Sequence, residues 1–254
     1  SSDRVRFGII VLVFGAACAS ARVPLEQRRT TVSDQSALTH DVDSILAAYD
    51  HPDTPGASVV IIRNGAVVLQ RNYGLADLET HTPITEHTNF RLASLTKQFT
   101  ATAILLLANQ GKLGLDDQIG TLLPELPVHA RKVTVRQLLT HTSGLWAYED
   151  FVPDTQTYQV KDRDVPSLLA HAESTYFRAG SAFRYSNTGY ALLALIVEHL
   201  SRRPFASFLH DRIFAPLGMD STVAFEAGVS MVPERAYGHS RTGSGFRRTD
   251  QSST

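Results

Sequence analysis

The sequence predicts an α+β protein, in which an antiparallel sheet is combined with a mainly helical region. Two apolar runs, 57–63 and 66–71, flank Asn64-Gly65, a pair that favours a two-residue hairpin turn. Over 90–217 the apolar spacing is mostly helical instead. The 254 residues are 43% hydrophobic and 19% charged, which suits a folded protein with a large core.

Capping and stop signals place the other elements along the chain. The unbroken apolar character of the hairpin strands implies that both faces of their sheet are covered. The run after Ser94 is apolar almost all round, so we expect a helix in the middle of the domain that ends at Asn109-Gln110-Gly111. Further helices are expected over 38–46, 119–123, from the capping box at 134–137, over 190–200 and over 205–214.

The first residues have the pattern of a targeting segment. Arg4 and Arg6 precede an apolar run over 7–17 and then small residues, so residues 1–21 are expected to be a secretory signal peptide. Residues 22–37 are interpreted as a polar spacer and 38–254 as the functional domain. We therefore expect an exported protein, periplasmic or secreted. Lipidation of Cys18 is an alternative, and the signal segment or this lipid would be the only membrane attachment.

Composition argues against several classes of function. The net charge is −1 and the arginine pairs are scattered, so the surface has no predicted basic stripe and no nucleic-acid partner is expected. Cys18 is the single cysteine, and the ten histidines show no ligand spacing, so we expect no metal and no cofactor. The expected partner is a small-molecule or peptide substrate.

Ser94 and Lys97 form the first candidate catalytic pair. Their S-x-x-K spacing places both side chains on one face at the start of the apolar helix. Burial of the amine would disfavour its ammonium form, and a neutral lysine beside a serine can take the hydroxyl proton. The motif alone is common by chance, however. The structural alternative is that Ser94 caps the helix and Lys97 is a solvated residue of its first turn.

Tyr185-Ser186-Asn187 is the second signal, and it lies directly before a predicted helix. A loop in this place can present side chains into a cleft. The tyrosine can relay protons, and the asparagine offers a donor and an acceptor to a substrate amide. Four aromatic residues of the preceding polar loop are either core residues or part of the cleft wall: Trp146, Tyr148, Phe151 and Tyr158.

Four motifs in this order resemble those of the serine β-lactamase and penicillin-binding-protein superfamily. They are Ser94-Leu95-Thr96-Lys97, His141-Thr142-Ser143-Gly144-Leu145, Tyr185-Ser186-Asn187 and Pro216-Leu217-Gly218-Met219. Tyr-Ser-Asn in place of Ser-Asp-Asn makes the chain similar to the branch of class C β-lactamases and D-Ala-D-Ala carboxypeptidases. The resemblance implies a β-lactamase/transpeptidase-like fold, an α/β sandwich with a mostly helical part and an antiparallel sheet.

The resemblance also implies a role for each candidate residue. Ser94 would be the nucleophile that becomes acylated, and Lys97 would accept its proton. Tyr185 would share this proton network and protonate the leaving amine, while Asn187 would bind the substrate's side-chain amide. The sequence leaves open whether Lys97 or Tyr185 is the general base. His141 is interpreted as a residue of a structural turn, with a packing role.

The third motif of the superfamily, K-T-G or H-x-G on a strand beside the nucleophile, is missing from its expected place. Arg241-Thr242-Gly243 resembles it superficially, but lies in a stretch rich in glycine and serine, too soon after Tyr185. We therefore expect the domain to be C-terminally incomplete, without the strands that would cover the hairpin. The apolar strand residues expected to lose cover are Val59, Ile61, Val67 and Leu69.

The leading hypothesis is a serine hydrolase that works through a covalent acyl-enzyme on a β-lactam, a D-Ala-D-Ala-type peptide or a small ester. These substrates present a carbonyl to the same serine, and the motifs do not choose among them. A non-catalytic or slow-turnover protein that binds or senses peptidoglycan is the alternative. A Ser-His-Asp hydrolase is disfavoured because the chain contains no G-x-S-x-G motif.

Overall fold

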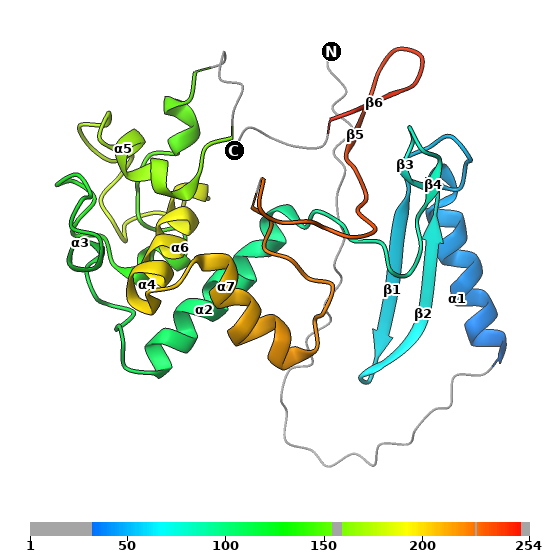
Figure 1. Cartoon of the computed structure of the whole chain (residues 1–254), viewed down its shortest axis with the longest axis horizontal. Coiled ribbons are helices and arrows are strands. Elements are labelled where there is room, and N and C mark those ends of the chain that lie inside the picture. Colours follow the sequence, from blue (N-terminus) through cyan, green and yellow to red (C-terminus); the bar gives the residue numbers. More distant parts are fainter. Residues whose placement is uncertain (1–31, 154–158, 227, 250–254) are drawn as a thin grey trace.

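The computed structural model describes residues 32–153, 159–226 and 228–249 (Figure 1). The predicted signal peptide and most of the predicted spacer lie outside these residues. Within the described ranges, no helix is long and apolar enough to cross a membrane. The helices are α1 Val32–Ile45, α2 Lys97–Asn109, α3 Ile119–Leu122, α4 Val135–Leu139, α5 Val165–Leu169, α6 Asn187–Ser201 and α7 Phe205–Leu209. The strands are β1 Ala57–Arg63, β2 Ala66–Tyr73, β3 Leu75–Asp77, β4 Thr82–Pro83, β5 His239–Arg241 and β6 Phe246–Arg248.

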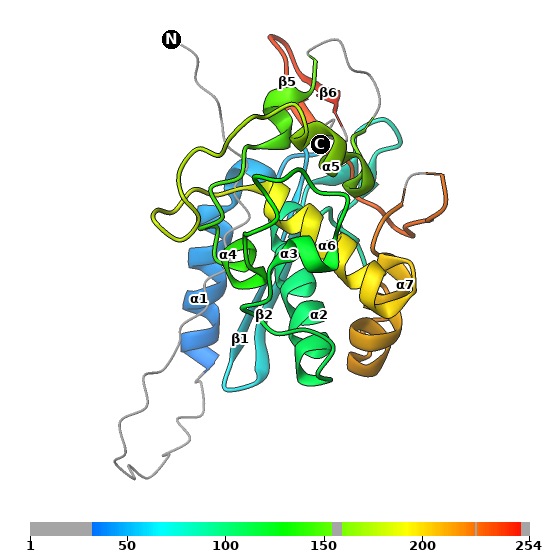
Figure 2. The same cartoon turned by 90° about the vertical axis from the view of Figure 1, so that its left-hand side faces the viewer.

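The helical part is built on the packing of α2 against α6 (Figure 2). Ile104 and Leu107 of α2 and Leu192 and Ile196 of α6 are fully buried in one hydrophobic core. This pairing brings the two ends of the described helical region together, because α2 opens it and α6 lies close to its end. α2 lies in the core as predicted, but its cover is not complete, since Leu105 is 51% exposed on its outer face.

The hairpin forms as the Asn64-Gly65 turn predicts. β1 and β2 pair in antiparallel register from Ala57 opposite Tyr73 to Arg63 opposite Ala66. Asn64 and Gly65 both adopt positive φ, 52° and 78°, which a tight turn of this hand requires. The sheets of the described residues are all antiparallel pairs, and with the helices they confirm the α+β class.

One face of the hairpin is covered by α1, and the other is open. The Tyr73 hydroxyl donates to Asp43 of α1 at 2.5 Å, and Leu69 on the same face is buried. The expectation that both faces are covered was therefore wrong. Of the four strand residues expected to lose cover, Val67 is exposed, Val59 and Ile61 are half-buried, and Leu69 is buried. Strand alternation turns Val59, Ile61 and Leu69 toward α1. The exposed apolar residues are Val60, Ile62 and Val67.

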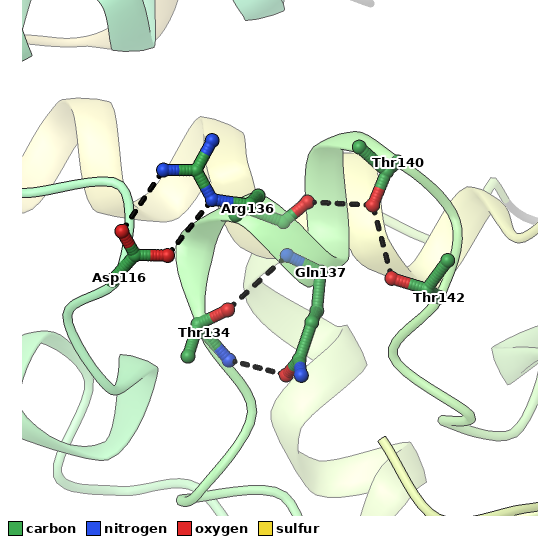
Figure 3. A network of polar contacts seen from close by, with 6 residues as sticks. All are labelled: Asp116, Thr134, Arg136, Gln137, Thr140 and Thr142. Carbon is green, nitrogen blue, oxygen red and sulfur yellow. Dashed lines mark hydrogen bonds and ion pairs between the residues drawn. The ribbon is translucent and has the colours of Figure 1, made fainter. Parts of the chain in front are cut away.

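Local polar contacts fix the start of α4 (Figure 3). The Thr134 hydroxyl accepts from the Gln137 N–H at 3.3 Å, and the Gln137 side chain accepts from the Thr134 N–H at 2.9 Å. This is the predicted capping box. Arg136 extends from the same turn and holds Asp116 through two hydrogen bonds of 2.8 and 2.9 Å. Beyond the helix, Thr140 and Thr142 are joined at 2.9 Å, which leads the chain into the His141 turn.

The structure differs from the prediction near both ends of the described chain. The first helix begins at Val32 rather than at residue 38, so the end of the predicted spacer is helical. The stretch after Tyr237, which is rich in glycine and serine and for which no strand was predicted, forms the β5–β6 hairpin. This hairpin returns to the N-terminal part of the chain, because Tyr237 N–H donates to Ala76 O at 2.8 Å and Arg248 lies 3.3 Å from Glu79.

Candidate active site

Ser94 lies in a 3-10 turn, Ala93–Thr96, that leads directly into α2 at Lys97. The prediction placed it in the first turn of the α-helix itself. In a 3-10 turn the residues i and i+3 eclipse each other, so the turn aligns Ser94 with Lys97. Ala93, immediately before the serine, has a φ of 48°, which is unfavourable for a residue with a Cβ. The chain thus enters the nucleophile's turn through a strained residue.

Tyr185-Ser186-Asn187 reaches the same place from the other side of the core. Ser186 is the extended N-cap residue of α6, and Asn187 is the first residue of the helix. The packing of α6 on α2 therefore brings this triplet to the start of α2. Ser94 is exposed and Tyr185 is 49% exposed, so the two hydroxyls are open to solvent.

The four predicted site residues are joined by hydrogen bonds. Ser94 Oγ lies 2.6 Å from the Tyr185 hydroxyl. Lys97 Nζ donates to Ser94 Oγ at 3.2 Å and to Asn187 Oδ1 at 2.7 Å. The serine hydroxyl thus contacts two groups that can exchange protons with it, and one of them, the amine, is held by an amide oxygen.

Two tyrosine rings line the site around the amine. Lys97 Nζ lies 4.8 Å from the centre of the Tyr185 ring and 5.5 Å from that of Tyr190. Ring faces attract a cation at such distances. Burial, and then the neighbouring Tyr185, raises the pKa of the Tyr190 hydroxyl. Tyr190 therefore remains a neutral donor, and it donates to Leu139 O at 3.1 Å.

His141 has a closer relation to the site than the predicted packing role. Its Nδ1 accepts from the Ser186 N–H at 3.2 Å, and its ring centre lies 4.6 Å from that of Tyr185. It also adopts a φ of 57° in the predicted turn. Burial, and then the charge of Lys97, holds the pKa of His141 below its ordinary value. A neutral imidazole therefore supports the backbone and the ring of the tyrosine motif.

Glu149 is a site neighbour that the sequence analysis missed. The Asn187 side-chain Nδ2 donates to Glu149 Oε1 at 2.7 Å. Glu149 lies in the 3-10 turn Tyr148–Phe151, within the aromatic loop. No motif marks it, and the only signal in the sequence is an acidic residue among the loop aromatics near the predicted cleft.

Some residues of the aromatic loop lie in the core, and others pack near the candidate site. Tyr148 is 7% exposed and belongs to the core. The Trp146 ring packs 4.1 Å from the ring of Tyr176, and Arg184, next to Tyr185, lies 3.8 Å from that Tyr176 ring. Tyr158 lies outside the described residues. The rings therefore brace the segment that carries Glu149 as well as filling the interior.

The sequence predicts no metal site and no third motif in its expected place. Among the described residues, no three histidine, cysteine, aspartate or glutamate side chains gather as metal ligands would. Arg241 ends β5, and Thr242 N–H donates to Gly245 O at 2.8 Å across the hairpin turn. The triplet Arg241-Thr242-Gly243 thus runs from the end of β5 into the short loop that joins it to β6.

Comparison with known proteins identifies the family of the chain. Residues 42–253 match the Beta-lactamase family. The chain belongs to this family. It is 36% identical over 191 residues to penicillin-binding protein 4* of Bacillus subtilis strain 168, an alignment that covers 72% of this chain and 41% of that relative. The predicted superfamily is therefore confirmed.

Solved structures similar to this member of the Beta-lactamase family include an amidase and a hydrolase. The D-amino acid amidase of Ochrobactrum anthropi SV3, solved with D-phenylalanine, has a TM-score of 0.69 and 30% identity over 82% of this chain and 58% of its own. EstCE1, a hydrolase with promiscuous acyltransferase activity, has a TM-score of 0.71 and 25% identity, covering 86% of this chain and 60% of its own. These similarities confirm the β-lactamase/transpeptidase-like fold.

The chain spans less than half the length of the curated relative and about three-fifths of the two solved structures. The matched part contains all four predicted site residues. The family resemblance thus covers the serine, lysine, tyrosine and asparagine motifs.

Proposed function

We propose that the protein is a serine hydrolase that forms a covalent acyl-enzyme at Ser94. The observation that carries this proposal is the position of Ser94 Oγ, which contacts the Tyr185 hydroxyl at 2.6 Å and Lys97 Nζ at 3.2 Å. A serine is a weak nucleophile until a neighbouring base removes its proton. Two proton-exchanging groups at these distances supply that activation.

In acylation, the Ser94 oxygen attacks the substrate carbonyl while its proton passes to Lys97. The C–O bond to the serine forms, the bond from the carbonyl carbon to the leaving group breaks, and Tyr185 gives its proton to the leaving amine or alkoxide. Lys97 then reprotonates Tyr185. In deacylation, a water oxygen bonds to the ester carbonyl carbon and gives one proton to Lys97 or Tyr185. The bond from that carbon to Ser94 Oγ breaks, the acid is released, and the proton passes to the serine oxygen.

The contact between Lys97 and Asn187 suits this proton transfer. A neutral amine has two N–H donors and one lone pair. Asn187 Oδ1 accepts from Lys97 at 2.7 Å, so one donor is directed away from the serine. In the structure the amine donates to Ser94 Oγ, so proton transfer would use its neutral form with the lone pair turned to that oxygen, while Asn187 Oδ1 keeps the other N–H. We propose that the second N–H of the Asn187 amide meets a substrate carbonyl.

The proposed substrates carry a reactive carbonyl on a small acyl group: a β-lactam, a D-Ala-D-Ala-type peptide or amide, or a small ester. The open site is consistent with this range, because Tyr185 is 49% exposed. The titles of the similar structures name a D-amino acid amidase and a hydrolase with acyltransferase activity. These chemistries share the acyl-enzyme and differ in the leaving group and the final acceptor.

Covalent labelling tests the proposal. Fluorescent penicillin and a fluorophosphonate should each label the parent protein, and peptide mapping should locate the adduct on Ser94. Ser94→Ala should abolish labelling. Ser207→Ala, an exposed serine on α7, is the matched control and should label like the parent. Equal labelling of the Ser94→Ala variant would show that the nucleophile is another residue.

The lifetime of the adduct separates hydrolysis from the alternative of a slow-turnover peptidoglycan sensor. A hydrolase should release the label and accept new substrate repeatedly, which a panel of nitrocefin, a D-Ala-D-Ala peptide, D-phenylalanine amide and p-nitrophenyl acetate would measure. An adduct that persists with every substrate would favour the sensor.

We also propose that the protein is exported, on the pattern of residues 1–21. Fractionation of cells that produce the protein, followed by N-terminal sequencing, should find it outside the cytoplasm and cleaved after Ala19 or Ala21. Recovery in the cytoplasm with residues 1–21 intact would contradict this proposal.

A further inference from the structure

The amide of Asn187 has a fixed orientation in the site, and Glu149 lies on the side that fixes it. Asn187 Nδ2 donates to Glu149 Oε1 at 2.7 Å, while Asn187 Oδ1 accepts from Lys97 Nζ at 2.7 Å. A carboxylate only accepts hydrogen bonds, so it selects the nitrogen end of the amide. If the amide flipped, its oxygen would face the carboxylate and its NH₂ group would face the amine.

The position of Glu149 is itself fixed by the residue after Asn187. Thr188 is fully buried, and its hydroxyl accepts from the Tyr148 N–H at 2.8 Å and donates to Trp146 O at 2.8 Å. Two consecutive residues at the start of α6 therefore hold the segment that carries Glu149. Thr188 holds its backbone, and Asn187 contacts its carboxylate.

The second oxygen of Glu149 strengthens the argument. Oε2 is buried and has no hydrogen-bond partner within the described protein. A buried carboxylate oxygen without a partner is costly, so this carboxylate is poorly placed if its only role is to stabilise the fold. The contact it does make is with the amide that holds Lys97.

From these contacts we infer that Glu149 is a positioning residue for the acylation of Ser94, acting through Asn187 on Lys97. This inference rests on the proposed function. The carboxylate keeps Asn187 Oδ1 turned toward Lys97, and Oδ1 in turn takes one N–H of the amine and leaves its lone pair for the Ser94 proton. Glu149 itself touches neither the serine nor the amine in this scheme.

The test compares three variants with the parent. Glu149→Ala removes the acceptor, and the acylation rate of Ser94 by p-nitrophenyl acetate should fall at least tenfold. Glu149→Gln keeps an acceptor oxygen and should remain within about threefold of the parent. Asp150→Asn is the matched control, because Asp150 lies on the same turn but bonds to Tyr176, and it should not change the rate.

A double-mutant cycle distinguishes positioning from a general structural effect. In an Asn187→Ala background, Glu149→Ala should cause no further loss, because the amide through which it acts is absent. The same fold loss in both backgrounds, or a parental rate for Glu149→Ala alone, would overturn the inference.

A second readout needs no turnover. The side-chain NH₂ signal of Asn187 in a ¹⁵N-resolved NMR spectrum, assigned by its loss in Asn187→Ala, should shift in Glu149→Ala and not in Asp150→Asn. An unmoved signal would overturn the orienting contact even in an active enzyme. If Ser94→Ala left the hydrolytic activity unchanged, the proposed function would be wrong, and so would the catalytic role of Glu149. The NMR signal of Asn187 would still test whether Glu149 contacts and orients the amide.

Discussion

The Tyr185 hydroxyl lies 2.6 Å from Ser94 Oγ, which makes it a closer neighbour of the nucleophile than the lysine amine at 3.2 Å. This short contact joins residues 91 positions apart in the sequence. Sequence reasoning left open which of the two groups is the base. The geometry is consistent with a relay in which both take part, so each should be essential in a different way.

Tyr185→Phe should impair turnover far more than binding. The variant keeps the ring that packs on His141 and removes only the proton carrier, so kcat should fall about 10²- to 10⁴-fold while KM stays within about threefold. Steady-state kinetics with an amide substrate and an activated ester would measure both. The ester should lose less, because its leaving group needs less protonation. A rise in KM with unchanged kcat would contradict the role of Tyr185.

Lys97→Ala should be nearly as severe as loss of the serine near neutral pH. Since the variant retains Ser94 and Tyr185, hydroxide should partly replace the missing base, and the residual rate should rise with pH above the parental optimum. A pH–rate profile of acylation from pH 6 to about 10 would test this. A flat profile in the variant would count against Lys97 as the proton acceptor.

Asn187→Ala should affect substrates according to their side chains. Every substrate loses the contact that holds Lys97, but only a substrate with an acylamido group also loses a donor from the Asn187 amide. KM should therefore rise more for acylamido substrates than for simple esters, by about tenfold for one lost hydrogen bond. Equal losses for both classes would limit Asn187 to the support of Lys97.

His141 should make the protein less stable in acid. Its folded pKa is lowered, first by burial, so the unfolded chain binds a proton at higher pH than the folded one does. The contribution of neutral His141 is thus present above about pH 6.5 and is lost as the pH falls below it. Urea unfolding at pH 7.5 and 5.5 should show a smaller pH dependence for His141→Gln than for the parent. Exposed His87→Gln is the control, and a matching change there would refute the assignment.

Gly144→Ala should be strongly destabilising. Gly144 has a φ of 71°, and a Cβ there would lie 2.1 Å from Phe177 O. Gly65→Ala provides the comparison, because Gly65 also has a positive φ, 78°, but an added Cβ meets nothing within 4 Å. Gly65→Ala should cost about 1–2 kcal/mol for the backbone conformation alone. Gly144→Ala should lower the free energy of unfolding by clearly more, as measured by thermal or urea unfolding. Equal losses for the two variants would show that the loop at Phe177 moves to make room for the added Cβ.

Features set by neighbouring residues could be predicted from the sequence. The Asn64-Gly65 turn, the Thr134 capping box and the Ser94–Lys97 spacing each depend on a few consecutive residues, and each lies where it was predicted. The exception among local features is the start of α1, which lies at Val32 rather than at the predicted residue 38, because a helix end is less sharply defined by its sequence than a tight turn is.

Features set by tertiary contacts could not be predicted. Glu149 reaches Asn187 only because Thr188 holds its loop against α6, and neither contact leaves a pattern in the sequence. The open face of the hairpin also escaped prediction. An unbroken apolar strand suggests cover on both sides. Which face is left open, here the one that carries Val60, depends on where α1 packs.

The separation of the nucleophile from its partner tyrosine has a practical consequence. Ser94 enters α2 and Tyr185 precedes α6, so neither helix alone assembles the relay, which forms only when the two have docked. A covalent label on Ser94, if the serine is acylated as proposed, would therefore count correctly folded molecules rather than total protein. The labelled fraction of a preparation can serve as a direct titration of native chain, and its loss during denaturation should coincide with the cooperative melting of the helical core.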